Sequence, residues 1–380
     1  MPASAISNLL DARFMTTAYY QRTNSSTPDN PLLQFFNSVK EQVFGGTVEV
    51  KIFNTTNTPA PTNNYGGKAK PLSQSAAKKI YLTPIHAFNE LPLDVMACMF
   101  LEMEDRPEVQ ALGKSEIDRQ MRDFRIRHNL LRTVSLGKTL FGGVIYRDVD
   151  GNITETSSTG PTIDLGFNAT TNGGQLARSN YSNFQGGSGN VIATKWEDAS
   201  ADILTQLDDI RELQEHRGLE APTEIWCHPT FKRYLRNNTS IKDWVKYNLG
   251  ARVDQVLKGD SWNDIGGYNW HFFGGTYQDA TGTTRTVFPR DKVAIHPPVE
   301  QGGWFRAIDA CFPVPGQSGV LKTGLDPSAP FSSGREIVYG DFMYAKEIDN
   351  PSIYIVRGGT TFLYAFANPD SILTPTVVGF

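Results

Sequence analysis

Two stretches, residues 47–53 (TVEVKIF) and residues 79–83 (KIYLT), decide how the fold of this chain is interpreted. Apolar and polar residues alternate in the first stretch, which is the period of a β-strand. The second stretch is rich in residues that favour strands. The connection between them, residues 54–78, is rich in Thr, Asn, Pro, Gly and Lys. Because hairpin loops usually have about two to five residues, we predict a long ribbon that reaches away from the body.

An isolated two-stranded ribbon is only marginally stable in water. We therefore expect a neighbouring subunit to bury this one, through six strand residues: Val48, Val50, Ile52, Ile80, Tyr81 and Leu82. The alternative is a flexible surface loop, which the residues alone leave open.

Residues 113–141 predict one long helix. Ile117, Met121, Phe124, Leu131 and Val134 follow one another at helical spacing. Ser115 and Asp118 have the spacing of a capping box, with Asp in place of Glu, and Gly142 and Gly143 end the pattern. At 1.5 Å per residue the helix would span roughly 43 Å. We expect its charged positions to form a solvated face; they are Arg119, Arg122, Asp123, Arg125 and Arg127.

Residues 152–192 are rich in Gly, Ser, Asn and Thr, which predicts a loop region or a small inserted element. An α/β unit follows. A helical pattern runs from Trp196 to Ile210 with Gly218 as its stop. A buried strand is expected at residues 224–227, and further helices at residues 229–235 and 251–257.

The end of the chain is β-rich. Strands are predicted at residues 337–345, 352–357 and 361–367, with Asn350–Pro351 and Gly358–Gly359 separating them. No repeat of 20 to 50 residues is visible. The sequence therefore predicts a fold of the α+β class.

Composition narrows the function. The 380 residues carry a net charge of −4, so nothing demands a nucleic-acid partner. Three widely spaced cysteines (Cys98, Cys227 and Cys311) make neither a disulfide framework nor a metal motif, and buried thiols in a reducing cytoplasm are expected. The sequence contains no run of eighteen apolar residues, so no membrane span is predicted. Residues 1–14 do not resemble a signal peptide.

Catalytic patterns are missing from the sequence. No G-x-S-x-G or H-E-x-x-H motif occurs. Residues 316–323 (GQSGVLKT) lack the spacing of a phosphate-binding loop, and His228, which follows an apolar strand, is expected to cap or pack. We therefore predict no catalytic, cofactor-binding or metal-binding residues. A carbohydrate-active enzyme, suggested only by the aromatic content of 11%, is the weakest alternative.

The order of these elements resembles the major capsid proteins of tailed phages, which have the Hong Kong 97-type fold. More narrowly it is similar to the lambda-like major capsid protein E family. The resemblance covers nearly the whole chain and is carried by the arm and ribbon, the run from Leu112 through Gly143, and the segments 196–235, 287–293 and 347–369.

The resemblance implies a division into six segments. Residues 1–46 would be an N-terminal arm, 47–92 an extended β-hairpin loop, and 93–151 a peripheral domain with the spine helix. Residues 152–195 would be a loop or insertion, 196–315 an axial domain, and 316–380 a return to the peripheral domain.

The same resemblance implies a structural protein and not an enzyme. It would assemble with itself into hexamers and pentamers of an icosahedral shell that encloses double-stranded DNA without sequence-specific binding. Portal, scaffold and decoration or cement proteins are the implied partners, with assembly in the host cytoplasm and a final place in the virion. An encapsulin-like compartment shell, or another phage structural protein such as a tail-tube or sheath protein, is the alternative.

This chain departs from the family in two features. Relatives that form a Lys–Asn crosslink carry the lysine in the extended loop, where this chain has Lys68, Lys70, Lys78 and Lys79. No motif for a partner asparagine or a catalytic carboxylate accompanies them, so we expect no crosslink. No long scaffold-like segment precedes the arm, so we expect scaffolding to be separate or already removed.

Overall fold

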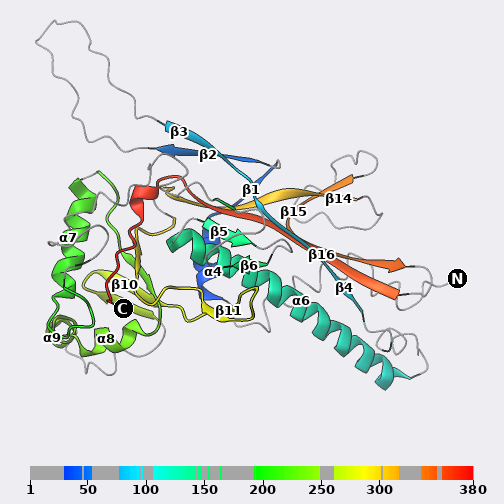
Figure 1. Cartoon of the computed structure of the whole chain (residues 1–380), viewed down its shortest axis with the longest axis horizontal. Helices are drawn as coiled ribbons and strands as arrows, with labels where there is room; N and C mark the ends of the chain where they lie inside the picture. The colour runs from blue at the N-terminus through cyan, green and yellow to red at the C-terminus, as the bar shows by residue number, and fades with distance from the viewer. Residues whose placement is uncertain are drawn as a thin grey trace, which may run out of the picture. The chain divides into compact units, whose positions relative to one another are not determined.

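The structure is a computed structural model of the whole chain (Figure 1). It describes residues 30–44, 47–53, 77–93, 96, 106–141, 144–147, 152–154, 163–164, 192, 194–216, 218–248, 261–300, 303–315, 335–348 and 353–379. The chain divides into two compact units. Unit 1 contains residues 1–48, 83–133 and 307–363, and unit 2 contains residues 49–82, 134–306 and 364–380.

A five-stranded sheet in the order β1-β14-β15-β16-β4 forms the frame of unit 1. Its first strand pairs in parallel with β14, whereas β14–β15, β15–β16 and β16–β4 are antiparallel. The strands are β1 (Lys40–Val43), β4 (Ile85–Pro92), β14 (Phe305–Pro315), β15 (Arg335–Ile348) and β16 (Ile353–Phe366).

The glycine pair Gly358–Gly359 does not separate two strands, as the sequence had predicted, but lies inside β16. Gly358 is paired with Asn89 of β4 on one side and with Met343 of β15 on the other. Backbone pairing on both sides keeps the strand continuous although glycine disfavours strands. The predicted break was wrong because the two neighbours supply what local propensity lacks.

Helix α6 (Pro107–Phe141) is the predicted long helix, and its 35 residues span about 52 Å. It ends immediately before Gly142, as expected. It begins six residues earlier than predicted because proline is well suited to the first helical position, where no backbone N–H is required. Ser115 therefore lies inside the helix, and the predicted capping box was wrong.

The predicted apolar stripe of α6 is confirmed at Val134 (2% exposed) and at three earlier positions, whereas Leu131 is only partly buried. Ile117, Met121 and Phe124 are at most 8% exposed. Arg125, which was expected on a solvated face, is only 9% exposed. The charged side of the helix is therefore not uniformly solvated.

A short N-terminal segment precedes β1 in unit 1. It consists of α4 (Pro31–Phe36) and the 3₁₀ turn η1 (Asn37–Val39). The Asn30 side chain accepts hydrogen bonds from the backbone N–H groups of Leu32 (3.1 Å) and Leu33 (3.4 Å), which is the usual role of an N-cap residue. Its amide also donates to Thr133 Oγ1 on α6 at 2.7 Å, which ties this segment to the long helix.

Unit 2 contains a four-stranded sheet in the order β13-β8-β10-β9. Its two central strands, β8 and β10, are parallel. The strands are β8 (Glu224–Cys227), β9 (Ser261–Ile265), β10 (Tyr268–Phe272) and β13 (Ala294–His296). Helices α7 (Ile203–His216), α8 (Phe231–Asn237) and α9 (Thr239–Asn248) belong to the same unit.

The helix predicted from Trp196 begins only at Ile203. Trp196 lies in the preceding turns, fully buried, and its Nε1 donates to Gln206 Oε1 at 2.8 Å. The apolar spacing correctly predicted that Trp196 is buried. Trp196 packs from the turns before the helix, however, and not from the helix itself. Gly218, with φ of 68°, follows the helix as expected, and the helix predicted at residues 251–257 lies outside the described residues.

Residues 364–380 belong to unit 2. Leu373 forms a β-bridge with Ile295, and Thr376 forms one with Lys292. Leu373, Val377 and Val378 are buried in the core that also contains Trp196 and Trp270. The apolar side chains at the end of the chain therefore complete the core of unit 2.

Several small sheets complete the described structure. Strand β2 (Val48–Phe53) pairs with β3 (Ala77–Leu82), and β11 (Thr276–Gln278) pairs with β12 (Thr284–Thr286). A three-stranded sheet contains β5 (Val144–Arg147), β6 (Ile153–Thr154) and β7 (Ile163–Asp164).

Candidate functional site

The two strands of the predicted ribbon, β2 and β3, pair with each other in a two-stranded sheet. Among the six predicted contact residues, Val48 and Val50 are each 1% exposed and Leu82 is 5% exposed within this one chain. Tyr81, by contrast, is 65% exposed. The side chains of Ile52 and Ile80 and the connection at residues 54–76 lie outside the described part of the chain. Among the four predicted contact residues whose side chains the structure describes, Tyr81 is therefore the one that exposes surface for a neighbour.

An exposed polar cluster joins the two ribbon strands. Lys79 Nζ lies 2.9 Å from Glu49 Oε1, and the Tyr81 hydroxyl donates to Glu49 Oε2 at 3.4 Å. The hydrogen bond from Lys79 holds the pKa of Glu49 below its ordinary value. Cross-strand pairs of opposite charge support the register of a ribbon, so this cluster keeps Tyr81 on the exposed side.

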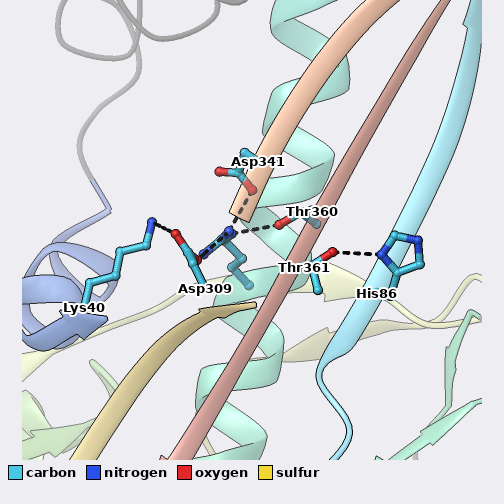
Figure 2. A network of polar contacts seen from close by, with 7 residues as sticks. Lys40, His86, Asp309, Asp341, Thr360 and Thr361 are labelled. Atoms are coloured by element: carbon cyan, nitrogen blue, oxygen red, sulfur yellow. Dashed lines mark hydrogen bonds and ion pairs between the residues drawn. The ribbon is translucent and has the colours of Figure 1, made fainter. Parts of the chain in front are cut away.

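A buried arginine, Arg132 on α6, connects three strands of the unit 1 sheet (Figure 2). Its Nη1 and Nη2 each lie 3.2 Å from Asp309 Oδ1 on β14, and Nη2 donates to Asp341 Oδ1 on β15 at 2.7 Å. Its Nε donates to Thr360 Oγ1 on β16 at 3.1 Å. The guanidinium also lies 4.7 Å from the centre of the Phe362 ring. One side chain thus fixes the long helix to β14, β15 and β16.

A fourth charge completes this network. Lys40, on the edge strand β1, forms an ion pair with Asp309 Oδ2. The two cations and two carboxylates sum to zero charge. Because an uncompensated buried charge is costly, the network favours the arrangement in which β1 is paired with β14.

The ionised form of Asp341 is stabilised by its surroundings. Burial acts to raise the pKa of Asp341, but the positive charges of Arg132 and Lys40 and a hydrogen bond from Thr360 outweigh burial and lower it. Arg132 is 4% exposed and Asp341 17% exposed at the side chain, so solvent screens this attraction only weakly.

Gly340, next to Asp341, makes room for the network. Its φ is 71°, a left-handed conformation that side chains rarely adopt. A Cβ atom at this position would lie 2.5 Å from Asp309 Oδ2. Glycine therefore meets both the backbone and the space requirement here.

Two neighbouring contacts join β4 to the same frame. His86 Nδ1 on β4 lies 2.9 Å from Thr361 Oγ1 on β16, as Figure 2 shows. His128 Nε2 on α6 lies 3.2 Å from Asn89 Oδ1 on β4. Burial lowers the pKa of both histidines, so neutral rings are favoured in these positions.

Sequence reasoning did not identify Arg132 or its partners. The available signal was the position of Arg132 between Leu131 and the buried residues Thr133 and Val134, within the apolar stripe of α6. An arginine on the buried side of a helix requires carboxylate partners. The partners, however, lie 177 and 209 residues away in the sequence, at Asp309 and Asp341, so local spacing could not identify them.

Unit 2 has its own polar cluster, centred on Glu224 of β8. His271 Nε2 lies 2.7 Å from Glu224 Oε2, and Asn269 Nδ2 donates to Glu224 Oε1 at 2.9 Å. Burial acts to raise the pKa of Glu224, but these hydrogen bonds lower it overall. His296 is fully buried, and burial lowers its pKa to about 4. The hydrogen bonds join β8 to β10 and bring together strands that are far apart in the sequence.

Other candidates for chemistry have structural roles. His228 Nδ1 accepts from the backbone N–H of Thr230 at 3.3 Å, the expected capping arrangement. Burial raises the pKa of the Cys227 thiol well above its ordinary value, whereas Cys98 and the loop at residues 316–323 lie outside the described residues. No group of three His, Cys, Asp or Glu side chains in the described ranges could hold a metal ion. Among the described helices, none has the length and apolarity needed to cross a membrane.

The comparisons with known proteins concern both sequence and fold. Residues 166–310 match the model of the family described as phage major capsid protein E. No curated protein matches the chain by sequence. The crystal structure of the putative capsid protein of a prophage of E. coli CFT073 matches with a TM-score of 0.53 at 11% identity, over 97% of this chain and 99% of that chain.

Two further solved structures match less closely. A phage-related protein from Bordetella bronchiseptica RB50 matches with a TM-score of 0.48 at 9% identity, over 94% of this chain and 95% of that chain. The mature capsid protein of bacteriophage PhiM1 matches with a TM-score of 0.44 at 13% identity, over 91% of this chain and 87% of that chain.

The fold defines the class: the chain has the Hong Kong 97-type capsid fold. Within that fold class, residues 166–310 are similar to the phage major capsid protein E family over the region that the family model matches. The resemblance inferred from the order of elements is confirmed.

Proposed function

We propose that this chain assembles with itself into hexamers and pentamers of an icosahedral shell that encloses double-stranded DNA. The observation that carries the proposal is the match of residues 166–310 to the phage major capsid protein E model. Closed point-group symmetry allows one chain to build a large shell from repeated contacts. Its place would be the virion, after assembly in the host cytoplasm.

The buried network of unit 1 supports this function physically. A subunit that is repeated many times in a shell must keep its contact surfaces in a constant relation. Arg132 joins α6 to three strands, and Lys40 adds the arm strand β1. Paired, hydrogen-bonded charges of this kind favour a single arrangement of the elements that they join.

The ribbon is proposed to contact a neighbouring subunit through the exposed Tyr81 and the connection at residues 54–76. The six residues first considered for this contact include three that are buried in their own chain. Val48, Val50 and Leu82 would therefore hold the ribbon to its own subunit, and Tyr81 would face the neighbour. Large aromatic side chains are enriched in protein interfaces.

Electron microscopy of the chain, expressed alone and together with the neighbouring genes, tests the proposal. Closed shells or rings of five and six subunits are expected. A chain that stays monomeric under all assembly conditions would contradict the proposal.

The contents of the shell distinguish a virion from an encapsulin-like compartment shell. Purified particles that contain double-stranded DNA, together with neighbouring genes for portal and packaging proteins, support the virion. Particles that enclose a cargo enzyme would favour the encapsulin-like alternative. Portal, scaffold and decoration proteins are proposed as partners, and they would co-purify with the shells from phage-producing cells.

A further inference from the structure

Acidic and basic residues of unit 2 are concentrated on different helices. Helix α7 carries four acidic residues and one basic residue, whereas α8 and α9 together carry five basic residues and one acidic residue. These helices all lie in the same unit, with α8 and α9 near the lower end of α7 in the view of Figure 1. The whole chain has a net charge of only −4, so this separation is local and not a consequence of composition.

The acidic residues of α7 form a stripe on its outer face. Asp208, Glu212 and Glu215 are exposed and follow one another at spacings of four and three residues. Side chains at these spacings lie on the same face of a helix. The opposite face of α7 is apolar and buried, through Leu207 and Ile210. The stripe is therefore presented outward.

The basic surface is formed by α8 and α9. Arg233 and Arg236 on α8, and Lys242 and Lys246 on α9, are exposed. Tyr247, beside Lys246, is 76% exposed, the highest value among the large exposed hydrophobic side chains of the described residues. The surface therefore combines positive charge with an aromatic side chain, a combination that is common at protein interfaces.

Both surfaces place like charges beside each other. Asp208 and Glu212, and likewise Lys242 and Lys246, are four residues apart on their helices. Like charges at this spacing destabilise an isolated helix. A partner surface of opposite charge would remove this cost, and each of the two surfaces has the sign that the other lacks.

We propose that the acidic stripe of α7 in one copy of the chain docks against the basic surface of α8 and α9 in the next copy around a ring. This inference rests on the proposed function, because a ring with a rotational axis uses two different, complementary surfaces on each subunit. Charge complementarity fixes the order of the copies and suppresses wrong contacts.

Charge reversal tests the contact. The variant Lys242→Glu/Lys246→Glu places acid against acid, and Asp208→Lys/Glu212→Lys places base against base. Each should raise the protein concentration required for shell assembly at least about tenfold, which is about 1.4 kcal/mol. The variant that carries all four changes restores opposite charges across the contact and should assemble near the wild-type concentration.

Controls separate the contact from folding and from general charge effects. Thermal melting should show that each variant subunit is folded. Glu220→Lys/Glu300→Lys changes the net charge as much as the α7 variant does, at two other exposed positions of unit 2, and should assemble normally. Because salt screens exposed charges, added salt should also weaken wild-type assembly, and it should weaken assembly less in the two-residue variants.

The outcomes are distinct. A wild-type chain that forms neither rings nor shells overturns the proposed function and this contact with it. Wild-type shells that are matched by both two-residue variants at the same concentration overturn this contact alone. A Lys242→Glu/Lys246→Glu variant that forms shells normally but encloses less DNA would assign the basic surface to nucleic acid and would also overturn the contact.

Discussion

At the scale of single residues, Arg132 decides how unit 1 is held together. Its guanidinium binds Asp309, Asp341 and Thr360, which come from three different strands. Lys40 then neutralises the remaining carboxylate charge. Each of the four charged groups is neutralised by its partners, so removal of one leaves the others without full compensation in a buried site.

Replacement of Arg132 by methionine should destabilise unit 1 strongly. The change keeps an apolar stem but leaves Asp309 and Asp341 without their guanidinium, and the cost of breaking such a buried pair is about 3–5 kcal/mol. Urea denaturation measures this loss as a lower free energy of unfolding. The matched control is Arg119→Met on the same helix, since Arg119 binds Glu116 on the surface. Equal losses in the two variants would contradict a special role of Arg132.

The depressed pKa of Asp341 predicts a dependence of stability on pH. Its pKa is lower in the folded chain than in the unfolded chain, so the ionised form stabilises the fold above the unfolded value of about 3.9. This contribution should be lost as the pH falls through the folded pKa. Melting temperatures measured between neutral pH and about pH 3 should fall less steeply for Asp341→Asn than for the wild type. Identical slopes would count against the assignment.

Gly340→Ala should be more destabilising than an ordinary glycine replacement. The positive φ alone costs about 1–2 kcal/mol for a residue with a Cβ atom, and the new Cβ would meet Asp309 at 2.5 Å. Gly282→Ala is the matched control, because Gly282 has a φ of 78° with no atom within 4 Å of its added Cβ. Thermal melting should show a larger decrease for Gly340→Ala, and a smaller or equal decrease would show that Asp309 moves without cost.

At the scale of elements, pairing partners override local propensity. Strand β16 runs through Gly358–Gly359 because β4 and β15 lie on its two sides. Helix α6 runs through Ser115 because its start is set further upstream, at Pro107. For β16 the sequence pattern predicted two strands that the neighbouring strands join into one, and for α6 it predicted the helix but placed its start six residues too late.

Deletion of residues 55–74 tests the ribbon as an element. Strands β2 and β3 would remain joined by three residues, which is a normal length for a hairpin loop of about two to five residues. The subunit should therefore fold, with an unchanged melting temperature, but assemble poorly because the deleted segment is proposed to contact a neighbour. Tyr81→Ser, which leaves the connection intact, should weaken assembly less. Normal shells from the deletion would contradict this role of the ribbon.

At the scale of the whole molecule, the C-terminal residues complete unit 2. Leu373, Val377 and Val378 are at most 4% exposed and belong to the core of this unit. The last residues of the chain are thus part of the fold of a unit whose other residues lie mainly between 134 and 306.

Leu373→Ala should lower the stability of unit 2 by about 2–5 kcal/mol, because the substitution leaves a cavity beside β13. Thr376→Ala, at a partly exposed position in the same segment, should have a much smaller effect. Differential scanning calorimetry measures both. If Leu373→Ala melts like Thr376→Ala, the C-terminal segment does not contribute to the core as described.

The sequence by itself determined the mixed class, the long helix with its apolar stripe, the paired ribbon strands and the resemblance to phage capsid proteins. These follow from residue periodicity and element order, which are local properties. Only the tertiary structure decided that Arg132 meets Asp309 and Asp341, that β16 is continuous, and that residues 364–379 pack in unit 2. Each of these depends on residues far apart in the chain, and the free energy of burying charge or apolar surface depends on contacts that no local pattern contains.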